Sequence, residues 1–246
     1  RFLMSMVYDS ARKKIVMYGG GDVIQWRGYG DTWEYDGKTW TKRSAKGPGN
    51  RCGYGLAYDE ARGKVVLFGG FDQDLKSTAD LWEWDGNQWQ HVQVQESPLP
   101  RSLMYTAYDS RRQKTVLFGG TDGTRIFGDT WEWDGSVFSK VAETGPEPRM
   151  WGSMAYDRKS GRMILFGGGT DIVDLDPNRS LGDTWEWDGH RWTCLKRTPP
   201  VQRQLISMAY DERRNTMVWF GGNSRDAGKL VRFNDTWELA LENSWD

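Results

Sequence analysis

The chain has 246 residues, with 33 Lys and Arg against 34 Asp and Glu, so its formal net charge is −1. This balance gives no electrostatic reason to expect a nucleic acid or an anionic membrane as partner, and no apolar stretch of about 18 residues is present to span a bilayer. The length suits one large all-β domain or two ordinary domains, and the counts that stand out are 15 Trp and 30 Gly.

In chain order, the first unit opens with Arg1, reaches Tyr8-Asp9 and ends an apolar run at Gly19-Gly20. The same series returns four more times, at intervals of about 50 residues. The later copies begin at Arg51, Arg101, Arg149 and Arg203 and carry the glycine pairs Gly69-Gly70, Gly119-Gly120, Gly167-Gly168 and Gly221-Gly222. Five copies in register indicate a repeat protein, and this period is typical of propeller blades.

A second motif follows each glycine pair after a loop of uneven length. It reads Asp, a small or apolar residue and then Trp, and the five tryptophans are Trp33, Trp82, Trp131, Trp185 and Trp237. Four copies continue with Glu, an aromatic residue, Asp and Gly. The fifth copy departs from this pattern, because it reads Trp237-Glu238-Leu239-Ala240, lacks Asp-Gly and reaches Trp245 one position late.

The second repeat illustrates the strands that this pattern predicts. We expect strands at residues 51–58, 64–68, 81–84 and 88–92, separated by turn signals such as Asp85-Gly86, which favours a tight hairpin. The sequence therefore predicts an all-β fold, a single β-propeller of five four-stranded antiparallel blades at residues 1–48, 49–98, 99–146, 147–200 and 201–246. The sequence starts at Arg1 with no signal segment, which indicates a processed product, an excised piece or a sequence cut at this point. Whether five blades close alone or belong to a longer chain stays open.

The repeat resembles the kelch family, in which a glycine pair ends the second strand, an aromatic residue lies in the third and a Trp in the fourth. The Tyr-Asp motif and the series Trp131-Glu132-Trp133-Asp134-Gly135 are similar to bacterial kelch-repeat proteins in particular. The resemblance covers essentially the whole chain. It implies a propeller whose loops after the glycine pairs lie on one partner-binding face, and it slightly favours a secreted or extracytoplasmic location over a cytoplasmic one.

We interpret the repeated residues as structural, because every blade has them and a catalytic site needs unlike residues that converge on one point. Each repeated Arg is expected to pair with the Asp of the Asp-Thr-Trp motif or to lie on an aromatic face. The glycine pairs allow positive φ and close backbone approach. Function is then expected in the loops after the glycine pairs, which hold 10, 9, 8, 14 and 12 residues before the motif Asp and vary most.

These loops supply the candidate binding residues for a protein or peptide partner, because aromatic side chains and Arg are typical of binding hot spots. The candidates are Trp26, Arg27 and Tyr29 in the first loop, Asp72 and Asp74 in the second, Arg125 and Phe127 in the third, Asp174, Asp176 and Arg179 in the fourth, and Arg225 and Arg232 in the fifth. Two alternatives stay open: the basic residues form an ordinary solvated surface, or Trp26 folds back onto its own loop. An acidic fourth loop between basic third and fifth loops suits a protein partner.

The fourth loop also contains a weak calcium candidate. Asp174, Asp176 and Asn178 alternate as oxygen ligands do in a calcium-binding loop. The segment lacks the Gly at the sixth position, however, and Trp185 stands where a bidentate Glu belongs. The sequence therefore predicts no cofactor beyond this low-ranking possibility.

No catalytic constellation is recognisable, and the chain is predicted to be a non-catalytic scaffold. His91 and His190 have no neighbours at metal-ligand spacing, so zinc is not expected. Cys52 and Cys194 occupy different positions in different repeats, so no disulfide is expected. The kelch resemblance leaves an alternative open: recognition of a carbohydrate or another small molecule, or processing like that of sialic acid epimerases, at the mouth of the central channel. Such processing needs acid and base groups at that mouth.

Overall fold

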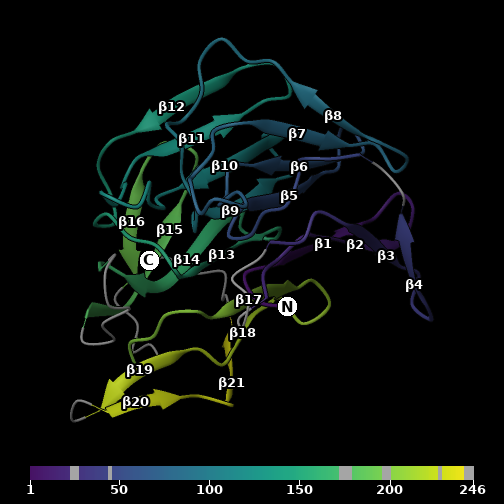
Figure 1. Cartoon of the computed structure of the whole chain (residues 1–246). Coiled ribbons are helices and arrows are strands. Elements are labelled where there is room, and N and C mark those ends of the chain that lie inside the picture. The colour runs from purple at the N-terminus through teal and green to yellow at the C-terminus, as the bar shows by residue number, and fades with distance from the viewer. Residues whose placement is uncertain (23–27, 44–45, 172–178, 196–200, 227–228, 241–246) are drawn as a thin grey trace.

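The computed structural model describes the whole chain apart from residues 23–27, 44–45, 172–178, 196–200, 227–228 and 241–246. Five of its antiparallel sheets are arranged as the blades of a β-propeller, a sixth is a separate two-stranded hairpin, and no α-helix occurs in the described part (Figure 1). The predicted all-β, five-blade fold is confirmed.

Blades 1 to 4 each contain four strands in sequence order. They are β1 (Ser5–Asp9), β2 (Lys14–Tyr18), β3 (Thr32–Tyr35) and β4 (Trp40–Arg43); β5 (Gly55–Asp59), β6 (Lys64–Phe68), β7 (Leu81–Trp84) and β8 (Trp89–Val92); β9 (Tyr105–Asp109), β10 (Lys114–Phe118), β11 (Thr130–Trp133) and β12 (Phe138–Ala142); and β13 (Ser153–Asp157), β14 (Arg162–Gly169), β15 (Ser180–Trp187) and β16 (Trp192–Leu195).

Blade 5 differs from the others. Its sheet contains β17 (Ser207–Asp211), β18 (Thr216–Phe220) and β21 (Thr236–Ala240), and the predicted position of a fourth strand, with Trp245, lies outside the described residues. The loop between β18 and β21 forms a hairpin of its own, β19 (Asn223–Asp226) and β20 (Lys229–Arg232), which projects from the disc (Figure 1). The loop sequence did not predict this hairpin, because it lacks the alternating apolar pattern of a half-buried strand.

The first strand of each blade lies nearest the common axis, and these inner strands pack in the order β1, β5, β9, β13 and β17 (Figure 1). An apolar cluster fills each interface between consecutive blades. Between blades 1 and 2, for example, Val16 and Tyr18 pack with Tyr58, Trp84 and Trp89. Four clusters of this kind join blade 1 to 2, 2 to 3, 3 to 4 and 4 to 5. Burial of large aromatic rings between sheets is thus the main apolar contribution to stability.

Two further observations concern the chain as a whole. No helix long and apolar enough to cross a membrane occurs among the described residues. Cys52 is buried and Cys194 is exposed, and no disulfide joins them.

Candidate functional site

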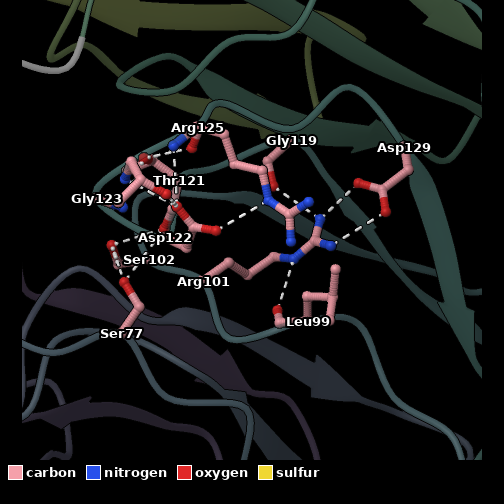
Figure 2. Close-up of polar contacts among 11 residues, drawn as sticks. Ser77, Leu99, Arg101, Ser102, Gly119, Thr121, Asp122, Gly123, Arg125 and Asp129 are labelled. Atoms are coloured by element: carbon pink, nitrogen blue, oxygen red, sulfur yellow. Dashed lines mark hydrogen bonds and ion pairs between the residues drawn. The ribbon is translucent and has the colours of Figure 1, made fainter.

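A repeated arginine anchors the loop face of each blade, and it is buried in blades 2 to 5. In blade 3, Arg101 is fully buried and donates hydrogen bonds of 2.6 and 3.1 Å to the two carboxylate oxygens of Asp129 (Figure 2). The same guanidinium donates to the carbonyl oxygens of Gly119 and Leu99. The equivalent pairs are Arg1–Asp31, Arg51–Asp80, Arg149–Asp183 and Arg203–Asp235. The predicted pairing of each Arg with the motif Asp is confirmed in all five blades.

These ion pairs perturb the carboxylates that they contain. Burial by itself raises the pKa of Asp129, but the hydrogen bonds and charge of Arg101 outweigh burial and hold that pKa below its ordinary value. In blade 1, burial likewise opposes the hydrogen bonds from Arg1 and Trp33, which prevail and lower the pKa of Asp31 to about 2. All the motif carboxylates are therefore ionised near neutral pH and act as fixed acceptors.

Phe127 supports Arg101 instead of facing solvent. The guanidinium carbon of Arg101 lies 4.1 Å from the centroid of the Phe127 ring, and that of Arg125 lies 4.8 Å from it. Phe127 is only 8% exposed, so its ring is covered, and its role in binding stays a prediction. The ring is covered because it stacks on the buried cation. Tyr29 lies against Arg1 in the same way, at 4.2 Å, but remains partly exposed.

The loop before Phe127 is a preformed turn. One carboxylate oxygen of Asp122 accepts hydrogen bonds from the backbone N–H groups of Thr124 and Arg125, and the other accepts from Nε of Arg125 at 2.9 Å (Figure 2). Burial opposes these bonds, which nevertheless lower the pKa of Asp122 to about 2. The exposed Arg125 is thus held by a rigid loop. Asp72 organises the second loop similarly, by accepting from the N–H groups of Asp74 and Lys76.

The other predicted loop residues are scattered over the same face. Arg179 is exposed and lies 3.6 Å from Asp171, and Asp74 and Arg232 are exposed. Trp26, Arg27, Asp174, Asp176 and Asn178 lie outside the described residues, and for Arg225 only the backbone, in β19, is described. The loops therefore do not gather these residues into one constellation within the described part of the chain.

A ring of five residues instead surrounds the mouth of the central channel on this face. They are Leu3, Gly53, Leu103, Trp151 and Leu205, each two positions after the repeated Arg, and their φ angles lie between 50° and 69°. Positive φ is uncommon for Leu and Trp. Backbone hydrogen bonds link the ring between blades, since the N–H groups of Gly53, Leu103 and Leu205 donate to the carbonyls of Leu3, Gly53 and Trp151 at 2.9, 2.6 and 2.6 Å.

The mouth leads into the channel. A cavity of about 380 Å³ is lined by the ring residues and by the residues that follow them, among them Phe2, Met4, Met104 and Ile206. It shares lining residues with a cavity of about 580 Å³ that runs along the inner strands to Tyr8, Tyr58, Tyr108, Tyr156 and Tyr210. In the described part of the chain, no Asp, Glu, Lys, Arg or His lines either cavity. Hydroxyls and methionine sulfurs are the polar and polarisable groups within them.

Ion pairs of one arginine bridge the opposite end of the channel. Arg158, in the turn after β13, contacts the carboxylate of Glu60 in blade 2 and lies 2.6 Å from a carboxylate oxygen of Glu212 in blade 5. Blade 3 separates blades 2 and 4, so this side chain reaches across the end of the channel. Among the described residues, no group of three or more His, Cys, Asp or Glu is placed to hold a metal ion.

Sequence reasoning missed both the mouth ring and Arg158. The ring residues share a fixed distance from the repeated Arg, but only Gly53 gives a sign of positive φ. Arg158 occupies the position after Tyr-Asp, which is Ser in two repeats, Glu in two and Arg in one. A basic residue at a repeat position that is otherwise Ser or Glu was the signal that could have identified it.

Comparison with known proteins gives information on the fold. No family model matches the chain, and no curated protein matches it. Among solved structures, that of YjhT is similar, with a TM-score of 0.76 and 16% identity over 98% of this chain and 82% of that one. The likeness supports the propeller fold.

Proposed function

We propose that the chain is a non-catalytic scaffold, built of kelch-type repeats, that binds a protein or peptide partner through the face formed by the loops after the glycine pairs. The observation that carries this proposal is the mouth of the channel on that face. Among the residues that the structure describes, tyrosine is the one ionisable side chain that lines its cavity of about 380 Å³, which is rimmed by Leu3, Leu103, Trp151 and Leu205. Such a pocket suits an apolar side chain of a partner.

The surroundings of the mouth fit the same function. Leu75, Leu99, Val201 and Leu205 are exposed on the loops and links of this face, and exposed apolar residues rimmed by polar ones are typical of protein-binding surfaces. Arg125 and the carboxylates of the second loop lie on turns that hydrogen bonds already order. Binding to preformed loops costs little ordering entropy.

Affinity capture from an extract of the native source tests this proposal. Leu205→Asp places a charge at the mouth, and Asp tolerates the positive φ of this position better than most residues. Val137→Asp is the matched control, because Val137 is also an exposed apolar residue but lies in the turn between β11 and β12 on the opposite face. A protein retained by the parent and by Val137→Asp, but lost by Leu205→Asp, is the expected result. Retention by Leu205→Asp contradicts the proposal.

A second candidate function rests on Arg158. Its guanidinium and the carboxylates of Glu60 and Glu212, at the other end of the channel, offer hydrogen-bond donors and acceptors for a sugar or a similar polyhydroxylated small molecule, and the two carboxylates offer acid and base groups. Thermal stabilisation by such a ligand, absent in Arg158→Gln and unaffected in Leu205→Asp, would favour this function over the scaffold.

A further inference from the structure

Consecutive blades of the propeller meet through the same contact each time. The tyrosine of the Tyr-Asp motif packs beside the aspartate of the preceding blade, as Tyr58 does with Asp9 and Tyr108 with Asp59. These tyrosines are 7% and 9% exposed, and the aspartates 2%. Tyr156 and Asp109 repeat the contact between blades 3 and 4.

The same two groups are uncovered between blade 5 and blade 1. Tyr8, which opens the series, is 56% exposed. Asp211, which ends it, has a side chain that is 31% exposed. Among the described residues, its carboxylate accepts hydrogen bonds from Arg213 and Arg214 of its own turn. Each therefore lacks the neighbour that the repeat provides elsewhere.

A second interblade contact shows the same break. The indole N–H of Trp89 donates to the hydroxyl of Thr32 in the preceding blade at 2.9 Å, and Trp192 donates to Thr130 at 2.8 Å. The matching tryptophan of blade 1, Trp40, is 40% exposed, and the matching threonine of blade 5, Thr236, is also exposed.

Backbone hydrogen bonds and core packing also join blades 1 to 5 in sequence but, among the described residues, not blade 5 to blade 1. The second glycine of blades 1 to 4 donates its N–H to the carbonyl of the next repeated Arg, from Gly20 to Arg51 through to Gly168 to Arg203. Within the described part of the chain, the N–H of Gly222 makes no such hydrogen bond to the carbonyl of Arg1. Phe220 is 55% exposed, whereas the next blade covers its counterparts Phe68, Phe118 and Phe166, which are at most 1% exposed.

From these unfilled contacts we propose that the sector between blade 5 and blade 1 is an interaction surface for one further four-stranded blade of the same repeat type. The side of that blade that meets blade 5 carries a tyrosine and an indole donor, which cover Asp211, Thr236 and Phe220. Its other side carries a buried aspartate and a threonine hydroxyl, which receive Tyr8 and Trp40. The five inner strands line a common cavity, so five blades already surround the axis. The sector that remains between blade 5 and blade 1 is therefore too narrow for a second five-blade copy.

Extension of the chain tests the proposal without reference to any binding partner. A second copy of residues 93–142, which contains the link into the third repeat and its four strands, is joined after Asp246. A copy of residues 43–92, from the second repeat, serves as an independent version. Tyr8→Ala and Tyr58→Ala are each introduced into the parent and into each extended chain, and the midpoints of thermal unfolding are compared. Light scattering gives the oligomeric state of every chain.

The expected result is a monomeric extended chain with a midpoint several degrees above that of the parent. In that chain Tyr8→Ala lowers the midpoint as much as Tyr58→Ala does, whereas in the parent Tyr8→Ala has little effect. Three results overturn the proposal. In the first, Tyr8→Ala and Tyr58→Ala are equally damaging in a monomeric parent, which means that blades 5 and 1 close on each other. In the second, the parent is a dimer that Tyr8→Ala dissociates, which makes a second copy the occupant. In the third, neither added repeat makes the chain sensitive to Tyr8→Ala.

Discussion

The guanidinium of Arg101 and the carboxylate of Asp129 form a paired, two-hydrogen-bond contact in which the arginine is completely buried. The pair ties the segment that enters β9 to the start of β11, beneath the loop that holds Asp122 and Arg125 (Figure 2). The rigidity of the loop face therefore depends on a buried charge.

Loss of Asp129 leaves that charge without its partner. We expect Asp129→Ala to lower the free energy of unfolding by about 3–5 kcal/mol, the usual result of breaking a buried ion pair. Arg125→Ala is the control, because it removes an exposed pair with Asp122, for which about 0–1 kcal/mol is typical. Urea denaturation of the three chains measures both. Equal losses from the two substitutions would mean that Arg101 is hydrated in solution.

Gly119 and Gly123 separate the effect of close packing from that of backbone conformation. Both have positive φ, at 66° and 94°, but a Cβ on Gly119 would lie 2.5 Å from the carbonyl oxygen of Arg149, whereas one on Gly123 meets nothing within 4 Å. Gly123→Ala is expected to cost about 1–2 kcal/mol from its backbone alone. Gly119→Ala should cost clearly more, and Gly119→Val should prevent folding. Chemical denaturation and soluble yield check this order, and a cooperatively melting Gly119→Val would contradict it.

The hydrogen bond between Trp192 and Thr130 predicts a repeat-dependent effect of Trp→Phe. Trp192→Phe leaves the fully buried hydroxyl of Thr130 without its donor, so we expect a loss of about 1–3 kcal/mol. Trp40→Phe, at the same repeat position in blade 1, should change stability by much less because Trp40 is exposed. Comparable losses at the two sites, in denaturant midpoints, would show that Trp40 is covered in solution.

Acid should unfold the protein through its aspartates. The folded state lowers the pKa of Asp31 to about 2, against an ordinary 3.8, and lowers the pKa values of Asp80, Asp129 and Asp183. In each case hydrogen bonds and charge from the paired arginine overcome the opposing effect of burial. The unfolded chain then binds more protons than the folded chain below the ordinary pKa.

The stability from these groups is therefore fully present above about pH 5 and is lost as pH falls from about 4 towards 2. Urea midpoints at pH 7, 5, 4 and 3 measure this loss. Asp31→Asn should reduce the decline between pH 4 and 3, because this position then binds no proton. A midpoint that stays constant down to pH 3 would contradict the role of the Arg–Asp pairs.

The sequence alone determined the repeat and the five blades, because these depend on local strand pattern and on residues that recur in every copy. For each repeated Arg it offered two partners, the motif Asp or an aromatic face, and the structure shows the pairing with Asp. It also located the variable loops, since their lengths differ in an otherwise regular series. The mouth ring could not be predicted, because Leu3, Leu103, Trp151 and Leu205 take positive φ only through contacts between blades.

The tertiary structure also decided which equivalent residues are covered. Phe127 looked like an exposed hot-spot residue, and only its stacking on Arg101 shows it to be buried. Tyr8 and Tyr58 occupy the same position in the repeat, yet Tyr58 is buried against the preceding blade and Tyr8 is not. A repeat sequence specifies the face that each blade presents, but burial of that face depends on whether another blade lies beside it in space.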